Sequence, residues 1–209
     1  MQLKELFPKI SKAIDENDIA CLGSLFSEYP GSIDLLTPFG SWLHYASNKS
    51  SVTTLKALVE FGIDPGIRVD PEDEDELSED GESPIVRAAQ SGKVENVKFF
   101  LQHKVELDTN NSLVNPLFGA VTGSSVEIVK LLIDAGIDTK VSYSGDMMKD
   151  MDALAFALER GESEIADAIA LHQTNGDAKK ADELKAERYG KGRRGRPPVP
   201  ENLAPPNDS

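Results

Sequence analysis

The sequence predicts an all-α fold, a solenoid of stacked helix–turn–helix units joined by short extended loops. The first observation is a frame in which a leucine or isoleucine is followed three residues later by an alanine. The frame occurs four times, at Leu43 and Ala46, Ile85 and Ala88, Leu117 and Ala120, and Leu154 and Ala157. The second observation is the spacing of these frames, at intervals of 42, 32 and 37 residues, which is typical of a repeat array.

Each frame predicts the first helix of a unit, and a second helix should follow it. Eleven residues after each alanine lies an apolar patch at helical spacing, centred on Ala57, Phe99, Leu131 and Ala168. The expected breakers between the two helices are Gly92, Gly123 and Gly161, with Ser50 and Ser51 in the unit that begins near residue 37. Gly62 and Gly136 are expected to end second helices.

A degenerate unit is expected before the four regular ones. Counting back 33 residues from Ala46 and Leu43 reaches Ala13 and Ile10, so residues 3–30 are predicted to form an N-terminal capping repeat. The expected repeat domain spans residues 1–173, with five units at about 3–36, 37–68, 80–110, 111–140 and 148–173. Residues 174–209 are expected to form a helical extension followed by a disordered basic, proline-rich tail.

Residues 81–92 resemble the ankyrin repeat, whose usual pattern is Gly-x-Thr-Pro-Leu-His-x-Ala-Ala followed by Gly. They match with Ser83 in place of threonine, Ile85 in place of leucine and Val86 in place of histidine. Residues 40–64 match with His44 at the motif histidine and Trp42 in place of proline. The resemblance implies a module that binds other proteins, and it implies that His44 hydrogen-bonds to backbone between neighbouring repeats rather than acting in catalysis.

The chain is strongly acidic, and the charge is uneven. Its 36 Asp and Glu against 22 Lys and Arg give a net charge of −14, and residues after Thr174 carry +2. Such a body repels nucleic acid and anionic membranes and attracts basic partners. Nine carboxylates lie between Asp70 and Glu82, within an expected loop insertion at residues 69–82. Two interpretations stay open, a docking element for a basic surface and a solubilising insert, while the segment lacks the glycine and spacing of a calcium loop.

The residues offer little for catalysis. Cys21 is the only cysteine, and no pair among His44, His103 and His172 has metal-ligand spacing. We therefore expect no enzyme, no cofactor and no metal. The sequence has no secretory signal and no long apolar run, so we expect a soluble cytoplasmic protein, or a nuclear one in a eukaryote.

The residues expected to contact a partner lie in the acidic loop and at the exposed positions of the first helices on a concave face. Trp42 is the aromatic residue expected to be a hot spot. The others are Asn48, Lys49, Glu72, Asp73, Glu74, Asp75, Glu76, Glu82, Gln90, Ser91, Thr122, Glu159 and Arg160. The partner is expected to be a protein with a basic surface, and no binding to a membrane is expected. Small acidic ankyrin proteins resemble the immunity proteins that neutralise bacterial toxins, which suggests one specific role.

An alternative function uses the tail. Arg194, Gly195, Arg196 and Pro197 resemble the core of the AT-hook, a short element that binds the minor groove of A·T-rich DNA. This motif would make the protein a DNA- or chromatin-associated adaptor. The acidic body opposes DNA binding, and a disordered tail without a ligand is the competing interpretation.

Overall fold

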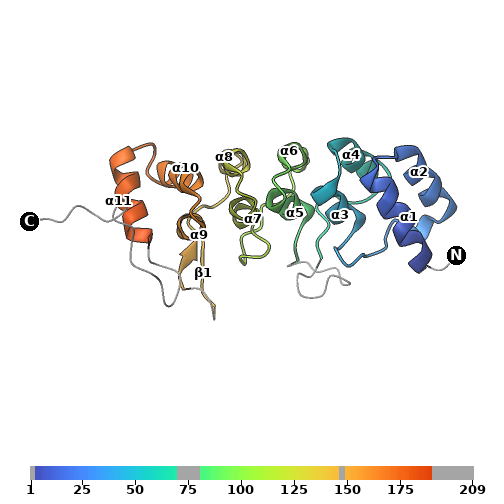
Figure 1. Ribbon diagram of the computed structural model, residues 1–209, viewed down its shortest axis with the longest axis horizontal. Coiled ribbons are helices and arrows are strands. Elements are labelled where there is room, and N and C mark those ends of the chain that lie inside the picture. The colour runs from blue at the N-terminus through green and yellow to red at the C-terminus, as the bar shows by residue number, and fades with distance from the viewer. Residues whose placement is uncertain (1–2, 70–80, 146–148, 190–209) are drawn as a thin grey trace, which may run out of the picture. The chain divides into compact units, whose positions relative to one another are not determined.

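The computed structural model describes residues 3–69, 81–145 and 149–189 of the 209-residue chain. Apart from two short strands and one 3-10 turn, the regular structure of these residues is α-helical (Figure 1). The predicted all-α solenoid of paired helices is confirmed. The chain forms two compact units, residues 1–119 and residues 120–209. None of the helices in the described ranges has the length and apolar character that a membrane span requires.

The N-terminal unit is built from successive helix pairs. The first pair is α1 (Leu3–Asp15) and α2 (Ile19–Glu28), and η1 (Pro30–Ser32) follows it. The next pairs are α3 (Trp42–Lys49) with α4 (Val52–Glu60), and α5 (Pro84–Gln90) with α6 (Val94–Gln102). Within this unit α1, α3 and α5 pack side by side in one row, and α4 packs against α6 in the other (Figure 1).

The repeated apolar frame forms the core of this unit. Ala46 and Ala88 are fully buried, and their small side chains let α3 and α5 approach closely. The capping helix α1 buries Ile10 and Ile14 completely, although it lacks the full repeat motif. The expected degenerate N-terminal repeat is therefore present as a helix pair.

Two polar side chains, the exposed Asn17 and the buried Asn96, join one helix pair to the next. Asn17 Oδ1 accepts hydrogen bonds from the backbone N–H of Ser51 at 3.0 Å and from the Thr54 hydroxyl at 2.8 Å. Asn96 Nδ2 donates to the carbonyl oxygens of Ser47 and Ser50, both at 3.1 Å. The bonds of Asn96 satisfy carbonyl groups at the end of α3 that would otherwise be buried without a partner.

In four of the helix pairs, the turn between the two helices uses a left-handed residue four positions after the frame alanine or its counterpart Ala13, whereas in the pair of α3 and α4 the residue at this place, Ser50, is extended (φ −97°). In the N-terminal unit these residues are Asn17 (φ 54°) and Gly92 (φ 65°), and in the C-terminal unit they are Ser124 (φ 52°) and Gly161 (φ 77°). The left-handed residue of this turn is Ser124, one position after the expected breaker Gly123. Position within the repeat decides which residue becomes left-handed more than residue type does, because tertiary packing offsets the modest strain of a non-glycine residue there.

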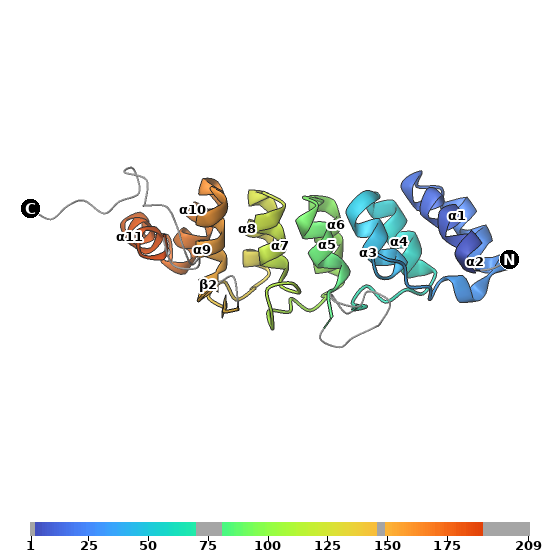
Figure 2. The same cartoon turned by 60° about the horizontal axis from the view of Figure 1, so that its bottom comes forward.

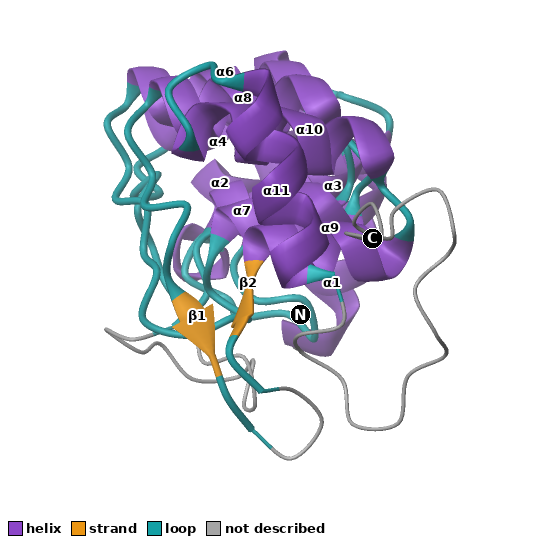
Figure 3. Ribbon diagram, turned by 90° about the vertical axis from the view of Figure 1, so that its left-hand side faces the viewer, coloured by secondary structure: helices purple, strands orange, loops and turns teal. Residues whose placement is uncertain are grey.

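The C-terminal unit begins inside α7 (Pro116–Thr122). It continues with α8 (Val126–Asp134), the antiparallel strands β1 (Ser142–Tyr143) and β2 (Met151–Asp152), α9 (Ala153–Arg160), α10 (Ser163–Gln173) and α11 (Ala178–Arg188). Ser142 pairs with Asp152, and β2 leads directly into α9 (Figure 3).

The last helix, α11, packs on both α9 and α10. Ala181 is its buried residue, and ion pairs to α10 and β2 add to the packing. Arg188 Nε lies 3.0 Å from Oδ2 of the buried Asp152, and Lys185 Nζ pairs with Asp167. This polar helix covers the end of the unit in place of a further repeat, as the atypical ends of repeat arrays do.

Candidate interaction surface

The ends of the first helices form a polar surface in the N-terminal unit. Asn48 and Lys49 at the end of α3 are exposed, as is Gln90 at the end of α5, and Ser91 is half-buried. The Ser91 hydroxyl donates to Asn48 Oδ1 at 2.9 Å, which aligns the two helix ends. The structure therefore brings these four predicted residues together on neighbouring helices.

Lys49 is held in place by an aromatic neighbour. Its Nζ donates to the Tyr45 hydroxyl at 3.1 Å and lies 4.6 Å from the Tyr45 ring centroid. The Tyr45 hydroxyl in turn donates to the Asp15 carboxylate at 3.1 Å. The hydrogen bond to Tyr45 raises the pKa of Lys49, so its ammonium stays charged. This part of the surface presents a cation within an acidic protein.

The C-terminal unit has a comparable surface. Thr122 and Arg160 are exposed, and Glu159 is half-buried. Arg160 Nη2 donates to the carbonyl oxygen of Thr122 at 3.3 Å, and its guanidinium carbon lies 5.6 Å from the Phe156 ring centroid. The exposed helix end again carries a cation beside an aromatic ring.

The prediction that Trp42 is an exposed hot spot is wrong. The side chain is fully buried, its Nε1 donates to the Ser32 carbonyl at 2.8 Å, and its ring stacks on Phe7 with centroids 5.6 Å apart. A large aromatic at the start of α3 fills the space between η1 and α1, so Trp42 is a core residue.

Glu82 is also not the exposed residue that was predicted. It is only 5% exposed, and Oε1 of its carboxylate lies 3.0 Å from Arg87 Nε. Its backbone pairs with Val69, with the Val69 N–H donating at 2.9 Å and the Glu82 N–H donating at 2.6 Å. The two residues close the base of the acidic insertion, and this closure is why Glu82 is buried.

The closure depends on a glycine and a histidine. A Cβ on Gly81 would lie 2.2 Å from the Val69 carbonyl oxygen, so no other residue fits without a backbone shift. His44 Nε2 lies 2.9 Å from the Glu82 carbonyl oxygen, and its Nδ1 lies 2.8 Å from Ser41 Oγ. Burial lowers the pKa of His44 to about 4. The neutral ring donates from Nε2 and accepts at Nδ1, and this bonding agrees with the structural role implied by the repeat motif.

Two predicted segments lie outside the described residues. They are the acidic residues Glu72, Asp73, Glu74, Asp75 and Glu76, and the tail residues Arg194, Gly195, Arg196 and Pro197.

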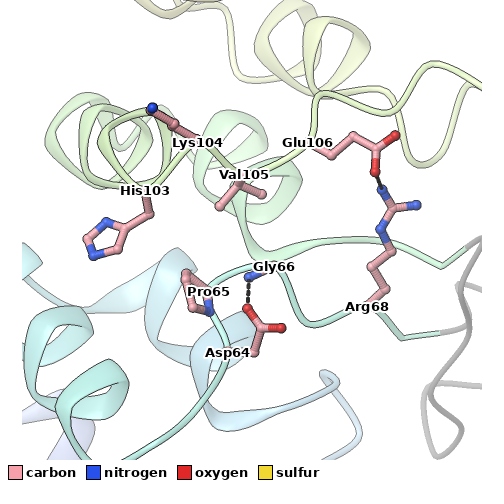
Figure 4. A pocket seen from close by; sticks show the side chains of 8 residues that line it. All are labelled: Asp64, Pro65, Gly66, Arg68, His103, Lys104, Val105 and Glu106. Atoms are coloured by element: carbon pink, nitrogen blue, oxygen red, sulfur yellow. Dashed lines mark hydrogen bonds and ion pairs between the residues drawn. The ribbon is translucent and has the colours of Figure 1, made fainter.

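A cleft of about 240 Å³ lies between the segments that follow α4 and α6 (Figure 4). Its lining residues are Asp64, Pro65, Gly66, Arg68, His103, Lys104, Val105 and Glu106. Arg68 is committed to ion pairs with Glu106 at 2.9 Å and Asp108 at 2.6 Å. His103 Nδ1 lies 2.9 Å from the Phe99 carbonyl oxygen. The wall of the cleft is charged, but its lining residues include no nucleophile beside a base.

The described ranges also contain no cluster of three or more His, Cys, Asp and Glu residues suited to a metal ion. The absence of a cofactor and of enzymatic activity stays a prediction.

Paired helices in a row, with polar and charged residues at their exposed ends, define a repeat-type binding scaffold. A family model for ankyrin repeats in three copies matches residues 10–111 and, in a second placement, residues 43–143. These matches span more than half of the chain, so the chain belongs to the ankyrin-repeat family. Ankyrin repeats are protein–protein interaction modules, and this protein is one of them. A comparison with curated proteins finds no match.

One exposed aromatic residue, Phe39, was not predicted from the sequence. Phe39 is 44% exposed, in the turn that precedes α3. The signal was the turn sequence from Thr37 to Gly40, because proline and glycine around an aromatic residue mark a tight turn that leaves the side chain outside.

Proposed function

We propose that this ankyrin array binds a basic protein, and that the acidic insertion attracts the partner to the ends of the first helices. The observation that carries the proposal is the concentration of charge. Nine carboxylates lie between Asp70 and Glu82 in a chain of net charge −14. The backbone pair of Val69 and Glu82 ties both ends of this segment next to α3. Such a field raises the association rate of a basic partner.

The helix ends have a different task in this proposal. Asn48, Gln90 and Ser91 supply amide and hydroxyl groups, and Lys49 and Arg160 supply cations. Cations do not attract a basic surface over long range. They suit short-range hydrogen bonds to carbonyl or carboxylate groups of the partner, which fix its orientation once it has arrived.

A specific form of this function is toxin neutralisation. An acidic array can cover the basic active-site cleft of a nuclease toxin, and the resemblance to small acidic immunity proteins supports this extension. The test is a titration at physiological salt against a cognate toxin and against an unrelated basic protein. Equal affinities for the two would remove the immunity role and leave general binding of basic proteins.

The motif of Arg194, Gly195, Arg196 and Pro197 supports DNA binding as the second candidate function. Gel shifts with A·T-rich duplex DNA test it. A DNA-binding tail predicts that the full chain shifts the duplex and that a chain ending at Gly190 does not. Identical behaviour of the two chains would reject it.

The main proposal is tested by neutralising the insertion. The variant carries Glu72→Gln, Asp73→Asn, Glu74→Gln, Asp75→Asn and Glu76→Gln. A matched control removes the same charge from exposed positions elsewhere, at Glu5, Glu16, Glu60, Asp134 and Glu164. In affinity capture from the source cells at 50 mM and 500 mM salt, we expect the wild type and the control to retain a basic protein at low salt, and the insertion variant to lose it. Equal retention by all three chains would contradict the proposal.

A further inference from the structure

Phe39 is presented to solvent by a turn that is itself well ordered. The Thr37 N–H donates to the Gly40 carbonyl at 2.8 Å, and the Gly40 N–H donates back to the Thr37 carbonyl at 2.9 Å. The buried Thr37 hydroxyl donates to the Gly40 carbonyl at 2.8 Å and accepts from the Phe39 N–H at 3.0 Å. Pro38, beside Phe39, is exposed as well. The backbone of this apolar tip is therefore fixed before any partner arrives.

The Phe39 side chain packs against a cluster of buried aromatic rings. Its ring centroid lies 5.7 Å from that of Tyr45, and Tyr45 lies 6.3 Å from the buried Trp42. Tyr45 is only 6% exposed, against 44% for Phe39. Phe39 is thus the exposed edge of an aromatic cluster, and an aromatic side chain held in this way loses little conformational entropy on binding.

The turn also lies against the base of the acidic insertion. A Cβ on Gly40 would lie 2.9 Å from Val69 Cγ2 and 3.1 Å from His44 Cγ. Val69 is the residue whose backbone pairs with Glu82. The segments that enter α3 and α5 run along the same edge of the N-terminal unit (Figure 2). An exposed aromatic therefore stands next to Val69 and Glu82, the paired residues that flank the most acidic part of the sequence.

We propose that Phe39 is the hydrophobic anchor of the interface with a basic protein, and that its ring enters an apolar pocket bordered by lysine and arginine side chains of that partner. The inference rests on the proposed function, because the neighbouring carboxylates determine the charge of the partner. Charge attraction alone produces weak and salt-sensitive complexes, whereas a buried aromatic anchor supplies affinity that salt does not screen. Phe39 therefore supplies the short-range affinity that makes the electrostatically attracted complex specific.

Site-specific photocrosslinking tests the location of the interface. The photoreactive residue p-benzoylphenylalanine replaces Phe39 in the full chain, and the matched control places it at Leu171, an exposed apolar residue of α10 that is 39% exposed. We expect ultraviolet irradiation of the source cells to join Phe39 to one basic protein and to leave position 171 without that adduct. No adduct at position 39, the same adduct at both positions, or an adduct with a second copy of this chain would overturn the inference.

Titration with the purified cross-linked protein tests the role of the ring. Phe39→Ala should weaken binding at least about tenfold with an unchanged salt dependence, Phe39→Leu should keep most of the affinity, and Leu171→Ala should change it less than about twofold. Thermal melting of each variant separates loss of fold from loss of contact. An unchanged affinity for Phe39→Ala, combined with weaker binding by the neutralised insertion, would reject the anchor and keep the proposed function. Weaker binding for Phe39→Ala, with no effect of neutralisation or salt, would keep the anchor and reject the basic partner.

Discussion

The loops before α3 and α5 occupy the same place in consecutive repeats, yet they present opposite chemistry. The loop before α3 is a tight turn that exposes Phe39 over buried rings. Before α5 the sequence carries a carboxylate-rich insertion, flanked by the paired residues Val69 and Glu82. The difference shows that the repeat frame constrains the helices strongly and the loops weakly. An insertion is compatible with the frame when backbone hydrogen bonds close its base.

The largest expected effect comes from breaking that closure. Gly81→Ala would place a Cβ 2.2 Å from the Val69 carbonyl oxygen, and backbone cannot yield as a flexible side chain does. We expect the free energy of unfolding of the N-terminal unit to fall by about 3 kcal/mol, the upper end for overpacked sites. Urea denaturation measures it. The control is Gly31→Ala, where a Cβ would meet nothing within 4 Å and the change should stay within about 0.5 kcal/mol.

Acidification should loosen the same junction, because His44 is buried in its neutral form. Its pKa in the fold is about 4, below the ordinary value of 6.5. The unfolded chain therefore binds a proton more readily, so the stabilisation is complete above about pH 6.5 and is lost as the pH falls toward 4. The loss should reach about 3 kcal/mol.

Urea denaturation of the wild type and of His44→Gln across this pH range checks the titration. His44→Gln should be less stable at pH 8 and should lack this part of the pH dependence, while His103→Gln, at an exposed histidine, should keep it. Parallel curves for the wild type and His44→Gln would show that His44 does not titrate in this way.

The other loop should respond less to a single change. Thr37→Val keeps the shape of the buried side chain but removes the hydroxyl that bonds the Gly40 carbonyl and the Phe39 N–H. We expect a loss of about 1 kcal/mol, typical of a hydrogen bond to a neutral group. Faster hydrogen exchange at the Phe39 amide, with the α3 amides unchanged, would place the effect in the turn. Exchange that rises throughout the unit would show that the turn is not an independent element.

The smallest effect is expected at the C-terminal ends of α3 and α5, opposite the loops that precede these helices. Ser91→Ala removes the hydrogen bond to Asn48 between α5 and α3. Because Asn48 is exposed and Ser91 is only half-buried, water replaces the lost partner, and the free energy of unfolding should change by less than about 0.5 kcal/mol. A larger loss would mean that the helix ends stabilise the array, which would weaken their assignment to binding.

The helices were predictable from the sequence because burial imposes a pattern on every repeat. The alanines at positions 46 and 88 must be small for α3 and α5 to pack, and counting back 33 residues from Ala46 and Leu43 located the otherwise irregular α1. The turn residue was less predictable. Ser124 adopts the left-handed conformation beside a glycine that was the natural candidate, because register within the repeat decides the position.

Individual surface residues were harder to predict than elements. Trp42 stands at a position that the repeat pattern leaves near the surface, but α1 and η1 cover it, and only their packing reveals this. In the sequence, Glu82 is one more carboxylate of an acidic run. Its burial follows from the pairing with Val69 across the insertion. Exposure of Phe39 follows from the local turn between Thr37 and Gly40, which helical periodicity does not report.

In the proposed function, charge in the insertion attracts a basic protein to this array. The direct measurement is the association rate constant of that partner, followed by stopped flow from 20 to 500 mM salt, for the wild type and the variant neutralised at residues 72–76. We expect the rate constant to fall steeply with salt for the wild type and much less for the variant, with the two rates converging at high salt. Equal slopes for the two chains would contradict it.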